Sequence, residues 1–236
     1  MKTLIRKASL STLGALLLIA GTTAAQAQVR ITEVAPWSSG NSPVGADWIE
    51  LTNTGSSAVS ISGWKMDDDS ASFSSAVALS GITSIGAGES VIFIEGSGTA
   101  LVNSFISNWF GGSAPAGLQI GTYSGSGVGL GAGGDQVNIF NSSGVLQASI
   151  KVGASDSSAP FHTFDNSAGT TGTGTTFTTL SVVGTNGAFL TASGNEVGSP
   201  GTVAAAVVPE PSSYALLLGG LAAVGLIARR RSGQQG

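Results

Sequence analysis

Alternation of apolar and polar side chains is the pattern that most limits how this chain can fold. Residues 29–34, 47–53 and 59–61 all alternate in this way. A period of two residues places the apolar side chains on one face of a β-strand. Further strands are predicted at residues 63–66, 76–79, 90–95, 137–140 and 145–152. Because turns rich in glycine, asparagine and serine separate these runs, we expect an all-β sandwich.

One short helix and one tight turn are expected within this β pattern. Leu101, Phe105 and Trp109 recur at helical spacing, which predicts a helix over residues 100–109. The Asn-Ser-Ser-Gly sequence at residues 141–144 predicts a hairpin turn between two strands, although it also matches a glycosylation sequon.

The first 27 residues predict a cleaved secretory signal. Three basic residues precede an apolar stretch at residues 10–20, and Ala25 and Ala27 supply the small side chains that signal peptidase accepts. The mature chain is then expected to begin at Gln28. An uncleaved anchor is the alternative, but the apolar stretch is short and a good cleavage site follows it.

The C-terminal end combines three features in a fixed order. A proline-glutamate-proline box comes first, an apolar run of 15 residues follows at 214–228, and three arginines come last. A helix of that length covers about 22 Å, less than the hydrocarbon core of about 30 Å, and basic residues beside it favour the cytoplasmic side. The two prolines keep the box extended, as a peptidase cleft requires. The box and the basic cluster consist of Pro209, Glu210, Pro211, Arg229, Arg230 and Arg231.

This three-part tail resembles the PEP-CTERM protein-sorting signal. The resemblance implies a partner, the membrane enzyme exosortase, which would recognise the box and cut at or near it. The chain would lie transiently in the inner membrane through its C-terminal helix and would then reach the cell surface or the extracellular space. Whether the tail is cut or exchanged for another group is left open. A plain C-terminal membrane anchor is the alternative reading.

The strand region resembles a second family, the lamin-tail domain. The resemblance is carried by residues 29–34, 47–53, 61–68, 85–89 and 91–94 in that order. It implies an immunoglobulin-like β-sandwich, best matched over residues 28–150. A glycine-rich stretch at 111–134 is interpreted as a long insertion, and 125–129 within it as a flexible loop.

The expected organisation therefore has five parts. These are a signal peptide (1–27), the sandwich (28–203), a linker with the sorting box (204–211), a hydrophobic sorting helix with the arginine cluster (212–231) and a tail (232–236). Residues 153–180 are rich in threonine, glycine and serine, so they could equally form a disordered loop.

Composition excludes several classes of function. The chain contains no cysteine, so disulfides and thiolate chemistry are absent. Residues 28–207 hold three basic and twelve acidic side chains, a net charge of −9. Such a domain repels nucleic-acid phosphates, and we expect no nucleic-acid partner.

The motif residues of the strands are expected to be structural. Trp48 shares one face of its strand with Glu50, while Ile49 and Leu51 share the other. Neither apolar set can be solvated without cost, so this strand is predicted to be covered on both sides. Trp64 is predicted to cap the core from the neighbouring strand.

Few side chains could carry chemistry. Asp67, Asp68 and Asp69 offer the oxygen ligands that Ca²⁺ prefers, but a solvated acidic turn explains them equally. His162 is the only histidine, with Asp165 three residues later, and a lone histidine is more often a packed or surface residue than a catalyst. Neither a nucleophilic triad nor a zinc site has its parts. No catalytic residue and no cofactor other than calcium is therefore assigned.

The sequence predicts a non-enzymatic exported protein that serves adhesion or matrix assembly, with exopolysaccharide or other matrix components as partners. One alternative is a glycan- or calcium-binding module of the envelope. Glycan binding would need exposed aromatic side chains, and the candidates are Trp37, Trp109, Phe110 and Tyr123. A third reading, an accessory module of a phosphoesterase or nuclease system, is disfavoured because no second domain of useful size remains.

Overall fold

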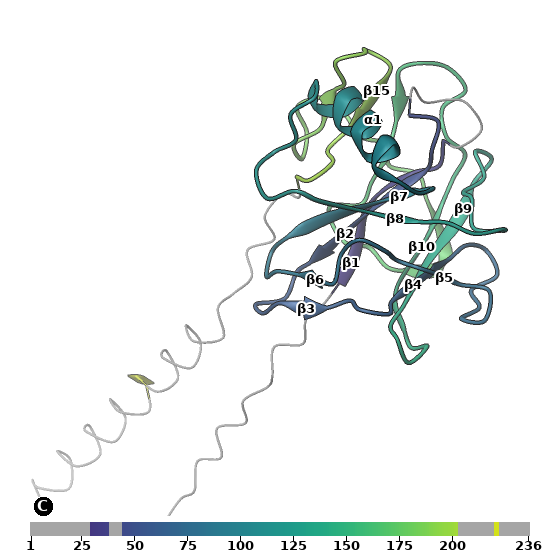
Figure 1. The fold of residues 1–236 in the computed structure, drawn as a ribbon, viewed down its shortest axis with the longest axis vertical. Coiled ribbons are helices and arrows are strands. Elements are labelled where there is room, and N and C mark those ends of the chain that lie inside the picture. Colours follow the sequence, from purple (N-terminus) through teal and green to yellow (C-terminus); the bar gives the residue numbers. More distant parts are fainter. Residues whose placement is uncertain (1–28, 38–43, 203–219, 222–236) are drawn as a thin grey trace, which may run out of the picture.

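The computed structural model describes residues 29–37, 44–202 and 220–221. Two five-stranded sheets face each other, and one helix lies over one of them (Figure 1). The predicted all-β sandwich of immunoglobulin type is therefore confirmed. The first sheet has the order β12 (Phe164–Asp165), β1 (Val29–Ala35), β2 (Trp48–Asn53), β7 (Ser90–Glu95) and β8 (Gln119–Tyr123).

The second sheet contains the predicted hairpin. Its order is β13 (Gly172–Phe177), β10 (Leu146–Val152), β9 (Asp135–Phe140), β4 (Lys65–Asp67) and β5 (Val77–Ala78). The Asn141 N–H donates to the Val145 carbonyl over 2.9 Å, and Gly144 has φ of 78°, a left-handed conformation that glycine adopts without strain. The predicted turn at residues 141–144 is confirmed.

Smaller elements complete the fold. A three-stranded sheet has the order β11 (Phe161–His162), β15 (Glu196–Gly198), β14 (Phe189–Leu190), and β3 (Val59–Ser60) pairs with β6 (Ser84–Ile85). Helix α1 spans Thr99–Phe110, which confirms the predicted helix. It is capped by Gly111, which has a left-handed backbone; the Gly111 N–H donates to the Ser107 carbonyl over 3.1 Å and the Gly112 N–H to the Ile106 carbonyl over 3.2 Å.

The inner core lies between the two large sheets. Ile49 and Leu51 from the first sheet and Val137 and Ile139 from the second are fully buried in it. Trp64, only 7% exposed, also packs there, as its predicted capping role requires.

An outer layer covers the opposite face of the first sheet. We use this name for α1, the β11–β15–β14 sheet and the aromatic cluster that they form with Trp48. The Trp48 and Trp109 rings meet edge to face at 5.4 Å between centroids, and Phe161 and Phe189 pack against the same cluster. All six residues of β2 are buried, so the predicted coverage of this strand on both sides is confirmed.

Two regions differ from the sequence-based expectation. The glycine-rich stretch at 111–134 is not one long insertion, because β8 lies within it and pairs in parallel with β7. Val128, within the loop predicted to be flexible at 125–129, and Leu130, directly after it, are buried in the inner core. Residues 153–180 contain β11, β12 and β13, and the last two extend the large sheets. Apolar side chains as widely spaced as Phe164 and Phe177 anchor this segment, and such sparse anchors leave no clear period in the sequence.

Candidate functional site

Two glutamates lie side by side on the outer face of the first sheet. Glu33 on β1 is opposite Glu50 on β2, and a β-bulge shifts the register between Ile31 and Glu33. The bulge lets two consecutive side chains, Thr32 and Glu33, reach the outer layer. The Thr32 hydroxyl donates to Glu50 Oε1 over 2.7 Å. Both glutamates are 1% exposed, so neither is a solvated surface acid.

The last residues of the domain satisfy these carboxylates. The Ser199 N–H donates to Glu33 Oε1 over 2.8 Å, and the Ser199 hydroxyl donates to Oε2 over 3.2 Å. The Thr163 hydroxyl also donates to Glu33 Oε1. The Gly201 N–H donates to Glu50 Oε2 over 2.6 Å. The pair therefore fastens the closing segment of the chain to the first sheet.

Burial shifts the acidity of both glutamates. Loss of hydration, and then the neighbouring charge of Glu50, raise the pKa of Glu33 to about 8. Burial also raises the pKa of Glu50 to about 7, with a smaller contribution from the charge of Asp165, although hydrogen bonds oppose the shift. The pair therefore retains a proton at neutral pH.

Perturbed pKa values often mark active sites, but the geometry of this pair is structural. The one ion pair within residues 29–37 and 44–202 joins His162 to Asp156, so no cation neutralises either glutamate. Every carboxylate oxygen of Glu33 and Glu50 accepts a hydrogen bond from the fold itself. The arrangement can hold a segment in place and bind a proton, but it presents no group to a substrate.

The acidic turn is built around a buried aspartate. Asp67 is fully buried, and its Oδ2 accepts hydrogen bonds from the Ser70 hydroxyl at 2.7 Å and the Ser72 N–H at 2.8 Å. Asp68 is partly buried, and burial followed by the charges of other aspartates raises its pKa. Asp69 is exposed. Across the described residues, no group of three or more histidine, cysteine or acidic side chains is placed to hold a metal ion.

His162 pairs with an acid that sequence reasoning did not single out. Its Nδ1 lies 2.6 Å from Asp156 Oδ2, and its backbone N–H donates to the same oxygen over 2.9 Å. Asp165, the nearby acid in the sequence, instead accepts hydrogen bonds from Ser167 and Asn186. In the part of the chain that the structure describes, no hydroxyl nucleophile is hydrogen-bonded to the imidazole, so the pair lacks the third member of a triad.

The aromatic side chains predicted for glycan binding are not exposed, and that prediction is wrong. Trp37, Trp109 and Tyr123 are at most 2% exposed, and Phe110 is partly buried. Trp37 stacks on Trp109 with 6.3 Å between ring centroids. Trp109 and Phe110 lie on α1, and Trp37 follows β1, so these three rings belong to the outer layer. Tyr123 packs in the inner core instead.

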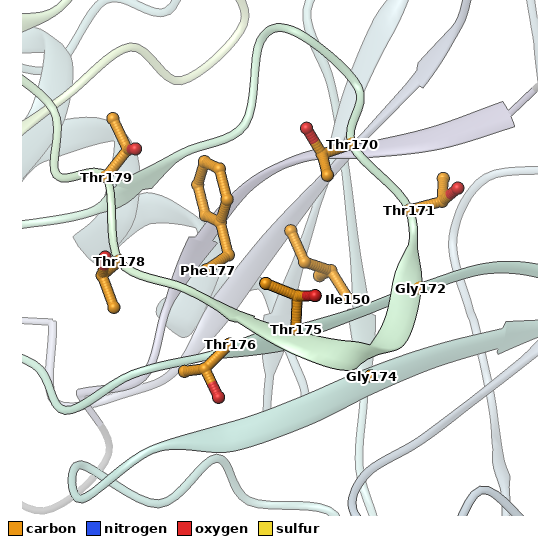
Figure 2. Close-up of a pocket in the computed structure, with 10 residues that line it drawn as sticks. All are labelled: Ile150, Thr170, Thr171, Gly172, Gly174, Thr175, Thr176, Phe177, Thr178 and Thr179. Carbon is orange, nitrogen blue, oxygen red and sulfur yellow. The ribbon is translucent and has the colours of Figure 1, made fainter.

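A groove follows the edge of the second sheet at β13. Two hollows of about 360 Å³ and 370 Å³ share Phe177 and Thr179 as lining residues. Figure 2 shows the Phe177 ring pointing into the first hollow, between Thr179 and the loop that carries Thr170. Asp165 and Asn186 line the second hollow. We call the two hollows together the Phe177 groove.

A family model assigns the sandwich. Residues 22–154 match the Lamin Tail Domain, which is more than half of the 236 residues. The chain belongs to the lamin tail domain family. None of the curated proteins matches it. This lamin tail domain extends structurally beyond the match, since residues 155–202 supply β12, β13 and the donors to the buried glutamates.

A second match covers the C-terminal end. Residues 207–231 match the PEP-CTERM protein-sorting motif, which includes the proline-glutamate-proline box and the three arginines. The motif marks this lamin tail domain protein for exosortase and for an extracellular destination. The box, the arginines and the predicted signal-peptidase site at Ala25 and Ala27 lie outside the described residues, as does the rest of the predicted signal peptide. Of the predicted sorting helix at 212–231, only residues 220–221 are described, and they are helical. Within the described ranges, no helix has the length and apolar character to cross a membrane.

Sequence reasoning missed the buried glutamates. Alternation alone assigns Glu33 and Glu50 to a solvent-facing side of their strands. The available signal was Trp48, because a tryptophan on the same face as Glu50 requires that this face be covered. Nothing local indicated that Ser199, 166 residues after Glu33, would supply the hydrogen bonds.

Proposed function

We propose that this protein is a non-enzymatic component of the cell surface or extracellular matrix, where its lamin tail domain serves adhesion or matrix assembly. The observation that carries the proposal is the sorting motif at residues 207–231, which directly follows the domain. Both matched families are of non-catalytic kinds.

The use of ionisable groups within the domain supports a structural role. Glu33 and Glu50, the glutamates with raised pKa values, are enclosed by the fold and engaged by it. An enzyme would instead direct such groups at a substrate. The acidic balance of the domain also supports the absence of a nucleic-acid partner.

Two partners follow from this proposal. Exosortase would act on Pro209, Glu210 and Pro211 while the C-terminal helix lies in the inner membrane. After release, the domain would contact exopolysaccharide or another component of the matrix. The signal peptide at residues 1–27 would bring the chain across the membrane first.

Deletion of the protein from its own cells tests the matrix role. We expect the deletion to reduce surface adhesion or the retention of matrix material, and the parent chain to restore it. A variant with Pro209, Glu210 and Pro211 replaced by alanine should fail to restore it, because it would remain in the inner membrane. Normal adhesion and matrix in the deletion strain would contradict the proposal, as would phosphoesterase activity of the purified protein.

Calcium binding at the acidic turn is the second candidate function. It is favoured by the buried Asp67 Oδ1, which has no hydrogen-bond partner among the described residues, beside the partly buried Asp68. Cation binding to the folded state would raise the melting temperature of the parent in millimolar calcium relative to a chelator. The D68N variant should lose that rise. Equal melting temperatures of the parent in both solutions would leave the turn a hydrogen-bonded structural element.

A further inference from the structure

We propose that the Phe177 groove binds a segment of a neutral polysaccharide. The inference rests on the proposed function, because the domain would encounter a matrix polysaccharide only outside the cell. Its two hollows, of about 360 Å³ and 370 Å³, share the aromatic ring of Phe177 as part of their lining. Each is within the size range of small-molecule sites, and together they offer room for adjoining sugar units.

Phe177 supplies the apolar platform. It is half-buried, packs against the inner core and lines both hollows. Figure 2 shows its ring directed into the first hollow, between Thr179 and Ile150. An aromatic ring has a negative face, and one side of a pyranose presents weakly positive C–H groups, so the two surfaces are complementary. Because the other edge of Phe177 is held by the core, the platform is fixed before a ligand arrives.

Threonine hydroxyls surround this platform. Thr170, Thr171, Thr175 and Thr179 are all exposed and line the first hollow. None of these hydroxyls is hydrogen-bonded to another described side chain. A hydroxyl both donates and accepts, so the set matches a ligand that is itself rich in hydroxyl groups and carries no charge.

An acid–amide pair lines the second hollow. Asn186 Nδ2 donates to Asp165 Oδ2 over 2.8 Å, while Asp165 Oδ1 accepts from the Ser167 N–H and hydroxyl. Asn186 has φ of 49°, a left-handed conformation that is uncommon for a residue other than glycine. Backbone strain of this kind clusters at binding sites. The carboxylate accepts hydrogen bonds, and the amide carbonyl, without a partner among the described residues, can accept another.

The rim of the groove is fixed by a buried asparagine. Asn166 Nδ2 donates to the Ile31 carbonyl over 2.6 Å and to the Thr170 carbonyl over 2.8 Å, and its Oδ1 accepts from the Thr170 N–H. Arg30 donates to the Gly169 carbonyl over 2.5 Å. A rim held in this way loses little conformational entropy when a ligand binds.

Charge and register favour a neutral sugar chain over other occupants. Among the described residues that line the two hollows, Asp165 is the only ionisable one. Residues 28–207 carry a net charge of −9, which repels acidic polysaccharides. A peptide strand could add to a regular sheet edge. However, the pairing of β13 with β10 jumps from Gly172 to Thr176 while β10 advances by one residue, so the edge is irregular.

Affinity electrophoresis of the full chain in mild detergent tests the proposal. Native gels would contain dextran, galactomannan or β-glucan as neutral probes and alginate as an acidic one. We expect at least one neutral probe to retard the parent and alginate to have no effect. F177A removes the platform, and N186G removes the amide while relieving the strained backbone; each should weaken retardation at least tenfold. L146A, an exposed aliphatic residue at the β9–β10 hairpin, is the matched control and should bind like the parent.

Thermal melting of every variant separates binding from folding. If F177A fails to fold, N186G still decides, because glycine adopts its backbone conformation freely. The proposal is overturned if no neutral probe retards the parent, if alginate retards it equally, or if both groove variants bind like L146A. It is also overturned if F177A abolishes self-association in sedimentation without any polysaccharide effect, which would make the groove a protein interface. If the groove does not bind polysaccharide, the adhesion results of the deletion strain still test the matrix role. Failure of the groove proposal can therefore be distinguished from failure of the proposed function.

Discussion

The two faces of the first sheet are buried by different chemistry. The inner core is largely aliphatic around Ile49 and Leu51. Residues 29–152 supply its buried side chains apart from Phe164, and Phe177 and Leu180 pack against it. The outer layer combines tryptophan rings with the Glu33–Glu50 pair, and it requires donors from residues 163–201. The free energy gained by burying apolar side chains depends little on how the side chains are oriented. A buried carboxylate, in contrast, requires hydrogen-bond donors at defined positions. The outer layer therefore ties the end of the domain to its first two strands.

Substitution of Trp48 and of Trp64 allows a direct comparison of the two faces of the first sheet, because Trp48 belongs to the outer layer and Trp64 to the inner core. We expect W48A and W64A each to lower the free energy of unfolding by about 3–5 kcal/mol, with W64A at the low end, because each leaves a cavity. Chemical denaturation monitored by circular dichroism measures both. Variants that melt within a few degrees of the parent would contradict these assignments. A W48A protein that loses only α1 while its sheets stay intact would show that the outer layer folds separately.

The buried glutamates make the outer layer sensitive to pH. Their pKa values of about 8 and 7 lie above the ordinary value near 4.5, so the folded chain holds protons that the unfolded chain releases. The contribution of the two glutamates to the free energy of unfolding is therefore full below about pH 4.5 and falls as pH rises toward 8. Each pH unit in this window costs roughly 1.4 kcal/mol per group, so between pH 5 and 7 we expect a loss of about 2–3 kcal/mol for each glutamate and about 4–5 kcal/mol for the pair. Denaturation midpoints across this range measure it.

E33Q sharpens the pH comparison. Its amide oxygen can accept from Ser199 and Thr163 as the carboxylate does, but it cannot ionise. The variant should lose much of the pH dependence, while D69N, which alters an exposed acid in the turn between β4 and β5, should keep it. A parent whose stability is flat or rises between pH 5 and 7 would show that the pair is not protonated in the fold.

The Ser199 hydroxyl should give the smallest effect. S199A removes one hydrogen bond to Glu33 and leaves the backbone N–H in place, so we expect a loss of about 1 kcal/mol. The loss should grow with pH as Glu33 ionises, because hydrogen bonds to charged acceptors are stronger. S193A, in an exposed turn of the same segment, should change stability by less than about 0.5 kcal/mol. Equal losses of unfolding free energy in S199A and S193A at all pH values would contradict a hydrogen bond between the Ser199 hydroxyl and the Glu33 carboxylate.

The sequence predicted the parts of the fold whose signals are local. Strands β1 and β2 alternate, α1 has helical spacing, and the turn at residues 141–144 has the composition of a hairpin. Trp48 with Glu50 on its face also indicated that the first sheet is covered on both sides. These patterns need no knowledge of distant residues.

The remaining features depend on contacts far apart in the sequence. β8 is short, contains a glycine and pairs in parallel with β7, so neither alternation nor a hairpin turn marks it. Glu33 and Glu50 look like surface acids until residues 199–201 close over them. The Phe177 groove joins β13 to Asp165 and Asn186, and the threonine-rich composition of that region resembles a loop. Burial of the aromatic rings at residues 37 and 109 required α1 and β14 to be in place.

The sorting of this lamin tail domain protein is tested most directly by the intact mass of the protein recovered from its own cells, measured in the inner-membrane and extracellular fractions. We predict that the natural form ends near Pro209 and lies outside the inner membrane. A variant with Pro209, Glu210 and Pro211 replaced by alanine should keep its tail and stay in that membrane. If both forms retain Arg231 and remain in the inner membrane, the protein is tail-anchored and the matrix role is contradicted.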